Sequence, residues 1–385
     1  MPKYIFILGQ SSELARQEII SVLNKQKIGL IATGSNFAIS ETDQPPQQLI
    51  NALGGTIKIA RLIDSINDLS QLTIQKWEKY LNLKTTTDKK IHFGFSLYND
   101  NQKNYKEITN VALQLKKILK NQNHKIRLVT GRQPELSSVI VAKNHLLNTE
   151  LIIIKHDFQY FLGMTEAVQD FIKYGQRDIA RPCRDSRSGM LPPKVAQMMI
   201  NLAGPARHKI ILDPFCGSGT ILQEAMLLGF KKIYGSDLKQ SAVDNTTQNI
   251  HWLKETFSLS SKEDIKKIDV KNLSQFFSIG SIDLIVTEPF LGEAGFIHRQ
   301  KDIQALEETK RELQQLYYRA FQEFYKILKP QGQIVFVFPI FNIGEKQLFT
   351  LDKKISQLGF CLQLKLPYSR PGQKVARQIT MWQKK

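Results

Sequence analysis

Residues 210–221 decide the fold, and they read Ile210-Ile-Leu-Asp-Pro-Phe-Cys-Gly-Ser-Gly-Thr-Ile221. An apolar strand runs into Asp213, the chain turns through Gly217-Ser218-Gly219, and an apolar helix follows. Glycines at such a turn let a ligand press against bare backbone, and the free N–H groups of the helix point at that ligand. The stretch therefore predicts a site for a nucleotide-type ligand.

Two further acids follow at the ends of the next expected strands. Asp237 comes 24 residues after Asp213 (237 − 213), at the end of the strand 233–236. An acid at about this spacing binds ribose hydroxyls in nucleotide sites. Asp237 could instead be an ordinary acid that caps the following helix. Asp269 ends the third strand, where it would accept from an adenine amine or serve as a turn acid. No Lys follows the glycines, so the stretch is not an ATP phosphate loop.

The fourth expected strand, 282–286, leads into Thr287-Glu288-Pro289-Phe290-Leu291-Gly292. From Lys209 onward, strands alternate with helices, which predicts an open, doubly wound and mostly parallel sheet. Residues 362–366 and 374–382 predict a closing antiparallel hairpin. Ligands of such sheets lie beyond the carboxyl ends of the strands, so these acids should meet in one crevice.

The N-terminal half has a different pattern, which predicts α+β modules. Residues 1–83 read strand–helix–strand–strand–helix–strand near their start, as in a ferredoxin-like domain. Residues 84–170 form a second α+β module, with strands predicted at 92–97, 126–130, 151–154 and 160–162 and helices at 106–119 and 134–147. Residues 171–191 form a basic connector, and residues 192–385 form the doubly wound domain.

Composition restricts the class of protein. The 385 residues carry a formal charge of +18 without any run of like charge, which favours a polyanionic partner over a generally basic proteome. The cysteines Cys183, Cys216 and Cys361 have neither zinc nor disulfide spacing, and the histidines show no metal pattern, so we expect no metal. Without an apparent signal peptide or membrane span, the sequence predicts a cytoplasmic protein that binds no membrane.

Several stretches together resemble a known family. They are Tyr4-Ile-Phe-Ile-Leu-Gly9, Arg184-Asp-Ser-Arg-Ser-Gly-Met-Leu-Pro-Pro-Lys194 and Asp213-Pro-Phe-Cys-Gly-Ser-Gly-Thr220. Over nearly its whole length the chain resembles Rossmann-like S-adenosylmethionine-dependent methyltransferases with an N-terminal THUMP module, in particular the group that modifies guanosine N2 at tRNA position 10. The resemblance implies S-adenosyl-L-methionine as cofactor, tRNA as partner and an RNA-binding THUMP-like segment at 84–170. It leaves room for a small activator subunit; otherwise we expect a monomer.

The resemblance also implies roles for individual residues. Asp237 would bind the ribose, Asp269 the adenine amine, and Asp213 with the glycine turn the methionine end. The cofactor-binding residues implied are Asp213, Phe215, Cys216, Gly217, Ser218, Gly219, Asp237, Leu238, Asp269 and Val270. The catalytic residues implied are Glu288, Pro289 and Phe290. Phe290 stands where such motifs normally carry a second proline.

The chemistry of Glu288 favours guanine as the target base. An ionised carboxylate only accepts hydrogen bonds, and guanine offers adjacent N1–H and N2–H donors that it can bind together. Adenine would present its N1 lone pair to the same group and be repelled. The Pro289 carbonyl would help to polarise the amine, and Phe290 would stack on an extruded base.

Contacts to RNA are spread more widely. The residues that the resemblance assigns to RNA are Arg132, Lys143, Arg370, Lys374 and Arg377. Each of them is equally compatible with a solvated surface role, and as a set they fit phosphate contacts that position the RNA. Residues Gly292–Lys301 are expected to form a lid.

Two other functions stay open at this point. A DNA adenine-N6 methyltransferase would use a related amine-binding motif. A non-catalytic RNA-binding protein with a decayed site would account for Phe290. The sequence leaves the modified nucleotide, mono- or dimethylation, and the oligomeric state undetermined.

Overall fold

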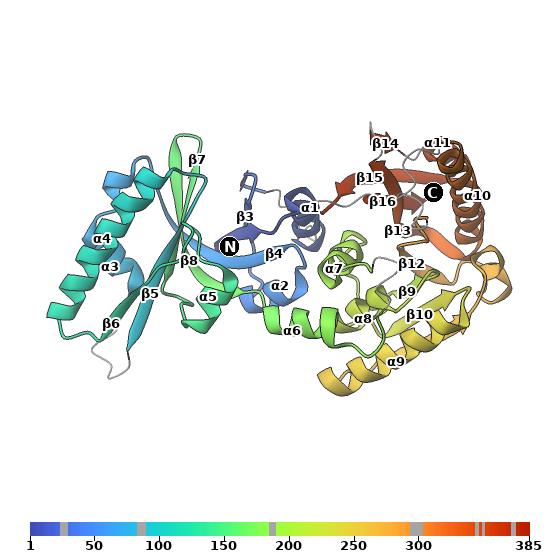
Figure 1. Cartoon of the computed structure of the whole chain (residues 1–385), viewed down its shortest axis with the longest axis horizontal. Coiled ribbons are helices and arrows are strands. Elements are labelled where there is room, and N and C mark those ends of the chain that lie inside the picture. Colours follow the sequence, from blue (N-terminus) through green and yellow to red (C-terminus); the bar gives the residue numbers. More distant parts are fainter. Residues whose placement is uncertain are drawn as a thin grey trace. The chain divides into compact units, whose positions relative to one another are not determined.

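The computed structural model describes residues 1–23, 30–82, 90–184, 190–292, 303–342, 346–348, 351–370 and 375–385. The chain forms two compact units. The first comprises Met1–Arg16 and Leu23–Phe171, and the second comprises Gln17–Val22 and Ile172–Lys385. Their elements are labelled in Figure 1, and each unit is described by itself.

The first unit is built on one eight-stranded sheet with the order β2-β3-β1-β4-β8-β7-β5-β6. The strands are β1 (Lys3–Leu8), β2 (Ala32–Thr33), β3 (Phe37–Glu41), β4 (Thr56–Ile66), β5 (Ile91–Tyr98), β6 (Ile126–Val129), β7 (Glu150–His156) and β8 (Gln159–Val168). The helices are α1 (Ser12–Leu23), α2 (Pro46–Ala52), η2 (Leu69–Gln71), α3 (Ile74–Leu81), α4 (Gln102–Asn121) and α5 (Ser138–Lys143). The tail of α1 clusters with the second unit.

The two segments 1–83 and 84–170 share this sheet. β4 pairs with β8 in antiparallel register from Lys58↔Val168 to Ile66↔Tyr160. A buried ion pair reinforces the join, since Lys58 Nζ lies 2.5 Å from Glu150 Oε1 and both side chains are fully buried. Such a pair fixes register more than it adds stability, because both charges lose their water. The division of the first unit at residue 83 stays a prediction.

The second unit holds the other sheet, with the order β11-β10-β9-β12-β13-β16-β15 and β14 paired to β13. Its strands are β9 (Ile210–Asp213), β10 (Lys232–Asp237), β11 (Lys262–Lys267), β12 (Ile282–Thr287), β13 (Leu328–Asn342), β14 (Lys346–Leu348), β15 (Phe360–Tyr368) and β16 (Val375–Lys384). Its helices are α6 (Phe171–Gly175), η3 (Gln176–Ala180), α7 (Pro193–Leu202), α8 (Thr220–Leu227), α9 (Gln240–Phe257), η4 (Val270–Gln275), α10 (Ile303–Ile327) and α11 (Asp352–Gln357).

The direction of these strands determines where a site can form. β9 to β13 pair in parallel, while β16 runs antiparallel to both β13 and β15. The predicted parallel sheet and its antiparallel closing hairpin are therefore confirmed. The register sets Gly235 beside Asp213 and Ile285 beside Leu212, so the carboxyl ends of β9, β10 and β12 lie at one edge.

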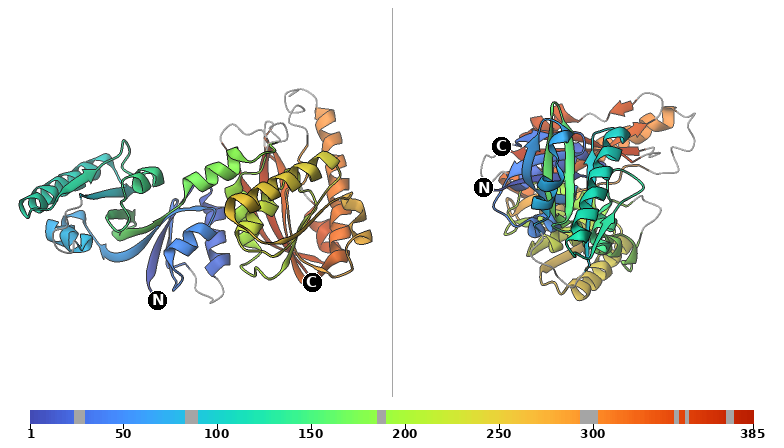
Figure 2. Two further views of the ribbon diagram at one scale, coloured as in Figure 1. Left: turned by 90° about the horizontal axis from the view of Figure 1, so that it is seen from below. Right: turned by 90° about the vertical axis from the view of Figure 1, so that its left-hand side faces the viewer.

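An aromatic core holds this edge in place. Phe321 of α10 packs between rings of β13 and β16, with centroids 5.1 Å from Phe336 and 6.0 Å from Trp382. All three side chains are fully buried, and burial of rings of this size contributes about 2–3 kcal/mol each. In Figure 2, α10 lies in orange alongside the red strands of the sheet.

Two local predictions were wrong in extent. The helix predicted at 134–147 is only α5, because His145 adopts the left-handed conformation (φ 54°) and ends it. The first of the two adjacent strands expected in residues 1–83 falls at 28–32 in the sequence pattern; it overlaps β2 only at Ala32, and residues 24–29 lie outside the described part of the chain. Neither difference affects the second sheet.

Candidate functional site at the carboxyl ends of β9, β10 and β12

The turn between β9 and α8 leaves one side of its backbone open. Gly217 and Gly219 have φ values of +54° and +81°, in the region that favours glycine. A Cβ built on Gly217 meets nothing within 4 Å, whereas one on Gly219 would lie 2.9 Å from Thr246 Cγ2. Gly219 is thus packed against α9, and the exposed backbone of Gly217 is where a ligand could approach.

Two buried polar side chains of α9 hold this turn. Thr246 Oγ1 donates to the Gly217 carbonyl at 2.8 Å, and Asn249 Nδ2 donates to the Ser218 carbonyl at 2.9 Å. Both residues are fully buried. The sequence analysis missed them, although polar residues three positions apart on the buried face of a helix were an available signal.

Asp237 lies next to the open turn. Its Oδ2 accepts from the Gly217 N–H at 3.1 Å and its Oδ1 from the Lys239 N–H at 3.0 Å. The carboxylate therefore closes the turn before α9, whose N-cap is Lys239, and it retains lone pairs for further donors. The neighbouring Leu238 is 61% exposed, an apolar surface at a strand tip that would suit the face of a base.

Asp213 lies behind the turn. It is 2% exposed, and its Oδ1 accepts from Thr287 Oγ1 at 2.6 Å and from the Phe215 N–H at 3.2 Å. Burial raises the pKa of Asp213 to about 7, and the charges of Asp237 and Glu288 add to the rise. This carboxyl ties the tip of β9 to that of β12, and its predicted role at the methionine end of a cofactor stays a prediction.

The remaining predicted cofactor residues lie around these acids. Asp269 Oδ1 caps η4 through the Lys271 N–H at 3.0 Å, and Val270 is 4% exposed. Phe215 packs against the core of the second unit. Cys216 is 5% exposed, and burial raises the pKa of its thiol, so it packs within the turn as an unreactive group.

Glu288 begins the segment after β12 and forms an ion pair with Arg377 of β16. Arg377 Nε donates to Glu288 Oε1, and its Nη2 donates to Oε2 at 3.2 Å. The side chains are 14% and 5% exposed. Burial raises the pKa of Glu288, and Arg377 opposes the rise through hydrogen bonding and charge.

The two residues after Glu288 differ in exposure. Pro289 is buried and Phe290 is 54% exposed, although it is a large apolar side chain. The Phe290 carbonyl accepts from Tyr317 Oη at 2.6 Å. Burial holds the pKa of Tyr317 well above its ordinary value, so the phenol remains a donor. This bond fixes the backbone of the motif from the side of α10.

The predicted RNA contacts divide into two groups. Arg132, Lys143 and Arg370 are exposed, and Arg370 Nε donates to Tyr368 Oη at 3.2 Å. Arg377 lies on β16, where it is 4% exposed and paired with Glu288, and its predicted contact with RNA stays a prediction. Lys374 and residues 293–301 of the expected lid lie outside the described residues.

Two arginines of the predicted basic connector are buried and hydrogen-bonded to α8. Arg177 Nε donates to Glu224 Oε1 of α8 at 2.7 Å, and Arg181 Nη1 donates to Thr220 Oγ1 at 2.7 Å. Both arginines are buried, at 8% and 3% exposure. These bonds attach α8, which follows the glycine turn, to the connector that precedes the second sheet.

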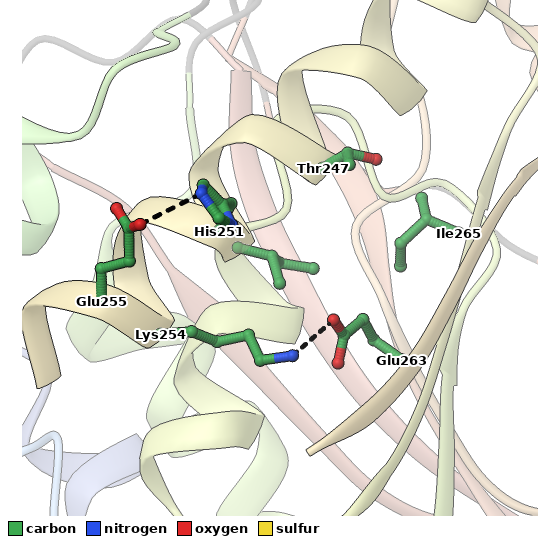
Figure 3. A pocket seen from close by; sticks show the side chains of 7 residues that line it. Thr247, His251, Lys254, Glu255, Glu263 and Ile265 are labelled. Carbon is green, nitrogen blue, oxygen red and sulfur yellow. Dashed lines mark hydrogen bonds and ion pairs between the residues drawn. The ribbon is translucent and has the colours of Figure 1, made fainter. Parts of the chain in front are cut away.

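A separate groove lies between α9 and β11, on the edge of the same unit. The residues that line it are Thr247, Ile250, His251, Lys254, Glu255, Glu263 and Ile265, and all of them except Ile250 are labelled in Figure 3. Its charged groups pair with one another, His251 with Glu255 at 3.2 Å and Lys254 with Glu263 at 2.7 Å. The groove contains none of the predicted site residues and has its charges satisfied.

The residues that could hold a cofactor fit a nucleotide with a charged amino-acid end. A ligand could approach the open backbone of Gly217, and Asp237 could accept hydrogen bonds from it. The exposed Leu238 offers an apolar surface beside them. Among the described residues, no group of His, Cys, Asp and Glu could hold a metal ion, and no helix is long and apolar enough to cross a membrane.

Comparison with known proteins identifies the family. A family model described as an RMKL-like methyltransferase domain matches residues 181–346, and one described as a DNA methylase matches residues 17–248. A tRNA (guanine(10)-N2)-dimethyltransferase of Methanocaldococcus jannaschii is 24% identical over 86% of this chain and 89% of that protein. Together the two family models span residues 17–346, and the chain belongs to a methyltransferase family.

Two further similarities agree with this assignment. The tRNA (guanine(10)-N2)-dimethyltransferase of Pyrococcus abyssi is 30% identical, and its match covers 40% of each protein. The crystal structure of TrmN from Thermus thermophilus shares the fold over 100% of both chains, with a TM-score of 0.56 and 16% identity. The DNA methylase model ends before β12, so its match does not include Glu288.

Proposed function

We propose that this methyltransferase transfers a methyl group from S-adenosyl-L-methionine to the N2 amine of guanosine 10 in tRNA. The observation that carries the proposal is the placement of Glu288 and the exposed Phe290 at the same sheet edge as the open glycine turn and Asp237. The relatives from M. jannaschii and P. abyssi, named for this reaction, support it.

The cofactor side is assigned to β9, β10 and the segment after β11. Asp237 accepts from the ribose hydroxyls, Asp269 from the adenine amine, and Leu238 with Val270 lines the base. Gly217-Ser218-Gly219 holds the amino-acid end, with Phe215 and Cys216 packed beneath it. When bound, S-adenosylmethionine supplies an electrophilic methyl group on a sulfonium.

The substrate side is assigned to the segment after β12. Arg377 occupies one lone pair on each oxygen of Glu288, so each oxygen keeps one for a further donor. Glu288 thereby accepts from both N1–H and N2–H of guanine, and the Pro289 carbonyl accepts the second N2 hydrogen. These bonds would localise the nitrogen lone pair toward the methyl group that the cofactor would supply, and the Glu288 carboxylate, which accepts from N2–H, would take the proton that the methylated nitrogen loses.

Exclusion of water completes the arrangement. Phe290 stacks on the extruded guanine, and its backbone is fixed by Tyr317. Hydrogen bonds to the amine are stronger where solvent is excluded. A single preorganised polar contact of this kind raises the turnover rate about 10²–10³-fold.

The first unit is assigned to RNA. We infer that residues 1–83 form a ferredoxin-like part and residues 84–170 a THUMP-like part of one RNA-binding unit, ahead of a Rossmann-like catalytic unit. Arg132, Lys143 and Arg370 contact phosphate groups. The cytoplasmic location, the monomeric state and a small activator subunit stay predictions.

A second candidate, DNA adenine-N6 methylation, is favoured by the DNA methylase model that matches residues 17–248. The ionised Glu288 opposes it, because the N1 lone pair of adenine would face a carboxylate that has no hydrogen to donate.

Nucleoside mass spectrometry tests the proposal. The purified protein, tRNA transcript and cofactor should yield N2-methylguanosine or N2,N2-dimethylguanosine, and a transcript with adenosine at position 10 should yield neither. Glu288→Gln should lower turnover at least about 100-fold with cofactor affinity retained, because the amide replaces one acceptor by a donor. Methylation of duplex DNA but not tRNA would support the second candidate. Cofactor binding without any methylated nucleoside would support a non-catalytic RNA-binding protein.

A further inference from the structure

A basic hollow of about 510 Å³ lies in the first unit, where α4 ends and β6 begins. The residues that line it are Lys90, Lys116, Lys120, His124, Lys125, Ile126 and Arg127. All except Ile126 are basic, and none is acidic. Both elements are labelled in Figure 1.

Three other lysines of the first unit illustrate cations that have carboxylate partners. Lys58 pairs with Glu150, Lys76 with Asp64, and Lys155 with Asp100. The groove between α9 and β11 in the second unit likewise satisfies its charges internally. In contrast, the ion pairs found among the described residues include none from Lys90, Lys116, Lys120 or Arg127.

One polar atom in the hollow also lacks a partner. His124 Nδ1 is buried and has no hydrogen bond within the part of the chain that the structure describes. Leaving a buried polar atom unsatisfied is unfavourable, and so is gathering like charges around one hollow. An anionic ligand in the hollow would relieve the repulsion among these like charges.

We propose that the basic hollow binds phosphate groups of the tRNA backbone and so provides an anchoring site in addition to Arg132 and Lys143. The inference rests on the proposed function, since it takes tRNA as the substrate. Lysine and arginine contacts to phosphate carry no sequence information, so this site positions the RNA rather than selecting the base. Affinity gained in this way depends on salt, because bound phosphates release counterions.

The chain offers a matched pair of variants on one helix. Lys116→Gln/Lys120→Gln removes two charges from the hollow, and Lys103→Gln/Lys106→Gln removes two from the other end of α4, where both lysines are exposed. Glutamine has nearly the helix propensity of lysine, so α4 should persist, as far-ultraviolet circular dichroism can verify. Lys90→Gln/Arg127→Gln tests the hollow a second time without changing α4.

The full-length protein and tRNA transcript are titrated between 50 and 200 mM salt. The magnitude of the slope of log K against log salt should fall by about 1 for each phosphate that the protein no longer neutralises. Either hollow variant should therefore lose about 2 from this slope, and its affinity for tRNA at 100 mM salt should drop about tenfold or more. The control pair should keep the wild-type slope. Turnover at saturating tRNA should stay at the wild-type value, since no catalytic residue has changed.

Equal losses of affinity in the control and hollow variants would overturn the inference, because net charge alone would then explain them. So would a wild-type slope in the hollow variants, or an effect seen only with vesicles of anionic lipid. Failure of the proposed function is distinguishable: tRNA would still bind with a hollow-dependent slope, but no N2-methylguanosine would form.

Discussion

At the scale of single residues, the Glu288 carboxylate has two requirements. It must stay ionised although it is buried, and it must keep acceptor capacity for a base. Arg377 serves both, because its charge opposes the rise in the pKa of Glu288 that burial causes, and its two bonds leave one lone pair on each oxygen. We therefore regard Arg377 as a positioning residue for Glu288.

Arg377→Met should lower turnover about 100-fold at pH 7, with partial recovery at higher pH. The sign follows from the pKa of Glu288: without Arg377 nothing opposes burial, so the carboxyl stays protonated to higher pH and accepts fewer hydrogen bonds. Steady-state turnover from pH 6 to 9 measures this, and Arg377→Lys should lie between Met and wild type. A raised KM for tRNA with unchanged turnover would instead indicate a phosphate contact.

Asp213 should make the fold less stable as pH rises. Its pKa is raised from 3.8 to about 7 by burial, so between about pH 4 and pH 7 the folded state holds a proton that the unfolded state has lost. The free energy of unfolding should therefore fall with pH in this range, by up to about 1.4 kcal/mol per pH unit from this group.

Asp213→Asn should reduce that slope, because the amide does not titrate and can still accept from Thr287. Urea unfolding at pH 5, 6 and 7 measures it. The buried Glu224, whose pKa is also raised to about 7, should leave a residual slope. An identical slope in the variant and the wild type would show that Asp213 is not the titrating group.

The sequence revealed the acids but not their partners. Asp213, Asp237, Asp269 and Glu288 each follow a strand, and strand ends can be located from apolar runs and turn residues. The pairing of Glu288 with Arg377 joins residues 89 positions apart on different strands. That contact depends on sheet order and side-chain direction, which the local pattern does not contain.

At the scale of elements, the β9–α8 turn gives its two glycines different tasks. Gly219 needs space, because a Cβ would strike Thr246 of α9, whereas Gly217 faces an open side. Both have positive φ, so any side chain costs about 1–2 kcal/mol in backbone strain. Only Gly219 adds a packing conflict to that strain.

Gly219→Ala should therefore lower the melting temperature of the second unit more than Gly217→Ala does. Gly217→Ala should instead weaken S-adenosylmethionine binding, because its methyl group would occupy the approach to the backbone. Differential scanning fluorimetry and calorimetric titration measure the two effects. Equal melting temperatures, or full cofactor affinity in Gly217→Ala, would contradict this division of roles.

Element types were easier to predict than element extents. The parallel strands and the terminal hairpin followed from apolar runs and from turn residues between them. The buried positions of Arg177 and Arg181 did not, because a stretch rich in arginine reads as solvated surface until its carboxylate partners on another element are known.

At the scale of the whole molecule, each unit has its own core. The rings around Phe321 fill the second unit, and separate clusters around Trp77 and Phe161 fill the first. Scanning calorimetry should therefore resolve two transitions, of which only one shifts when S-adenosylmethionine is added at 100 times its Kd. The stabilisation expected is about 2.7 kcal/mol. A single transition that moves as a whole would show that the units unfold together.

The net charge of +18 indicated a polyanionic partner, but its distribution could not be predicted. Arg177 of the connector forms an internal ion pair, while Lys116 and Lys120 of α4 line a basic hollow and form no ion pair among the described residues. Total charge is a sum over the sequence, whereas the local field depends on which side chains fold together.

The shared sheet of the first unit has a practical consequence for fragments of this protein. A cut at residue 83 would separate β4 from its neighbour β8. The N-terminal fragment would then expose one edge of the eleven-residue β4, and the C-terminal fragment would expose one edge of the ten-residue β8. Long uncovered edges of this kind recruit other strands and aggregate. The two halves should precipitate when they are produced separately, or pair again when they are co-expressed. An exchange of N-terminal parts between relatives would therefore have to include all of residues 1–171 or none of them.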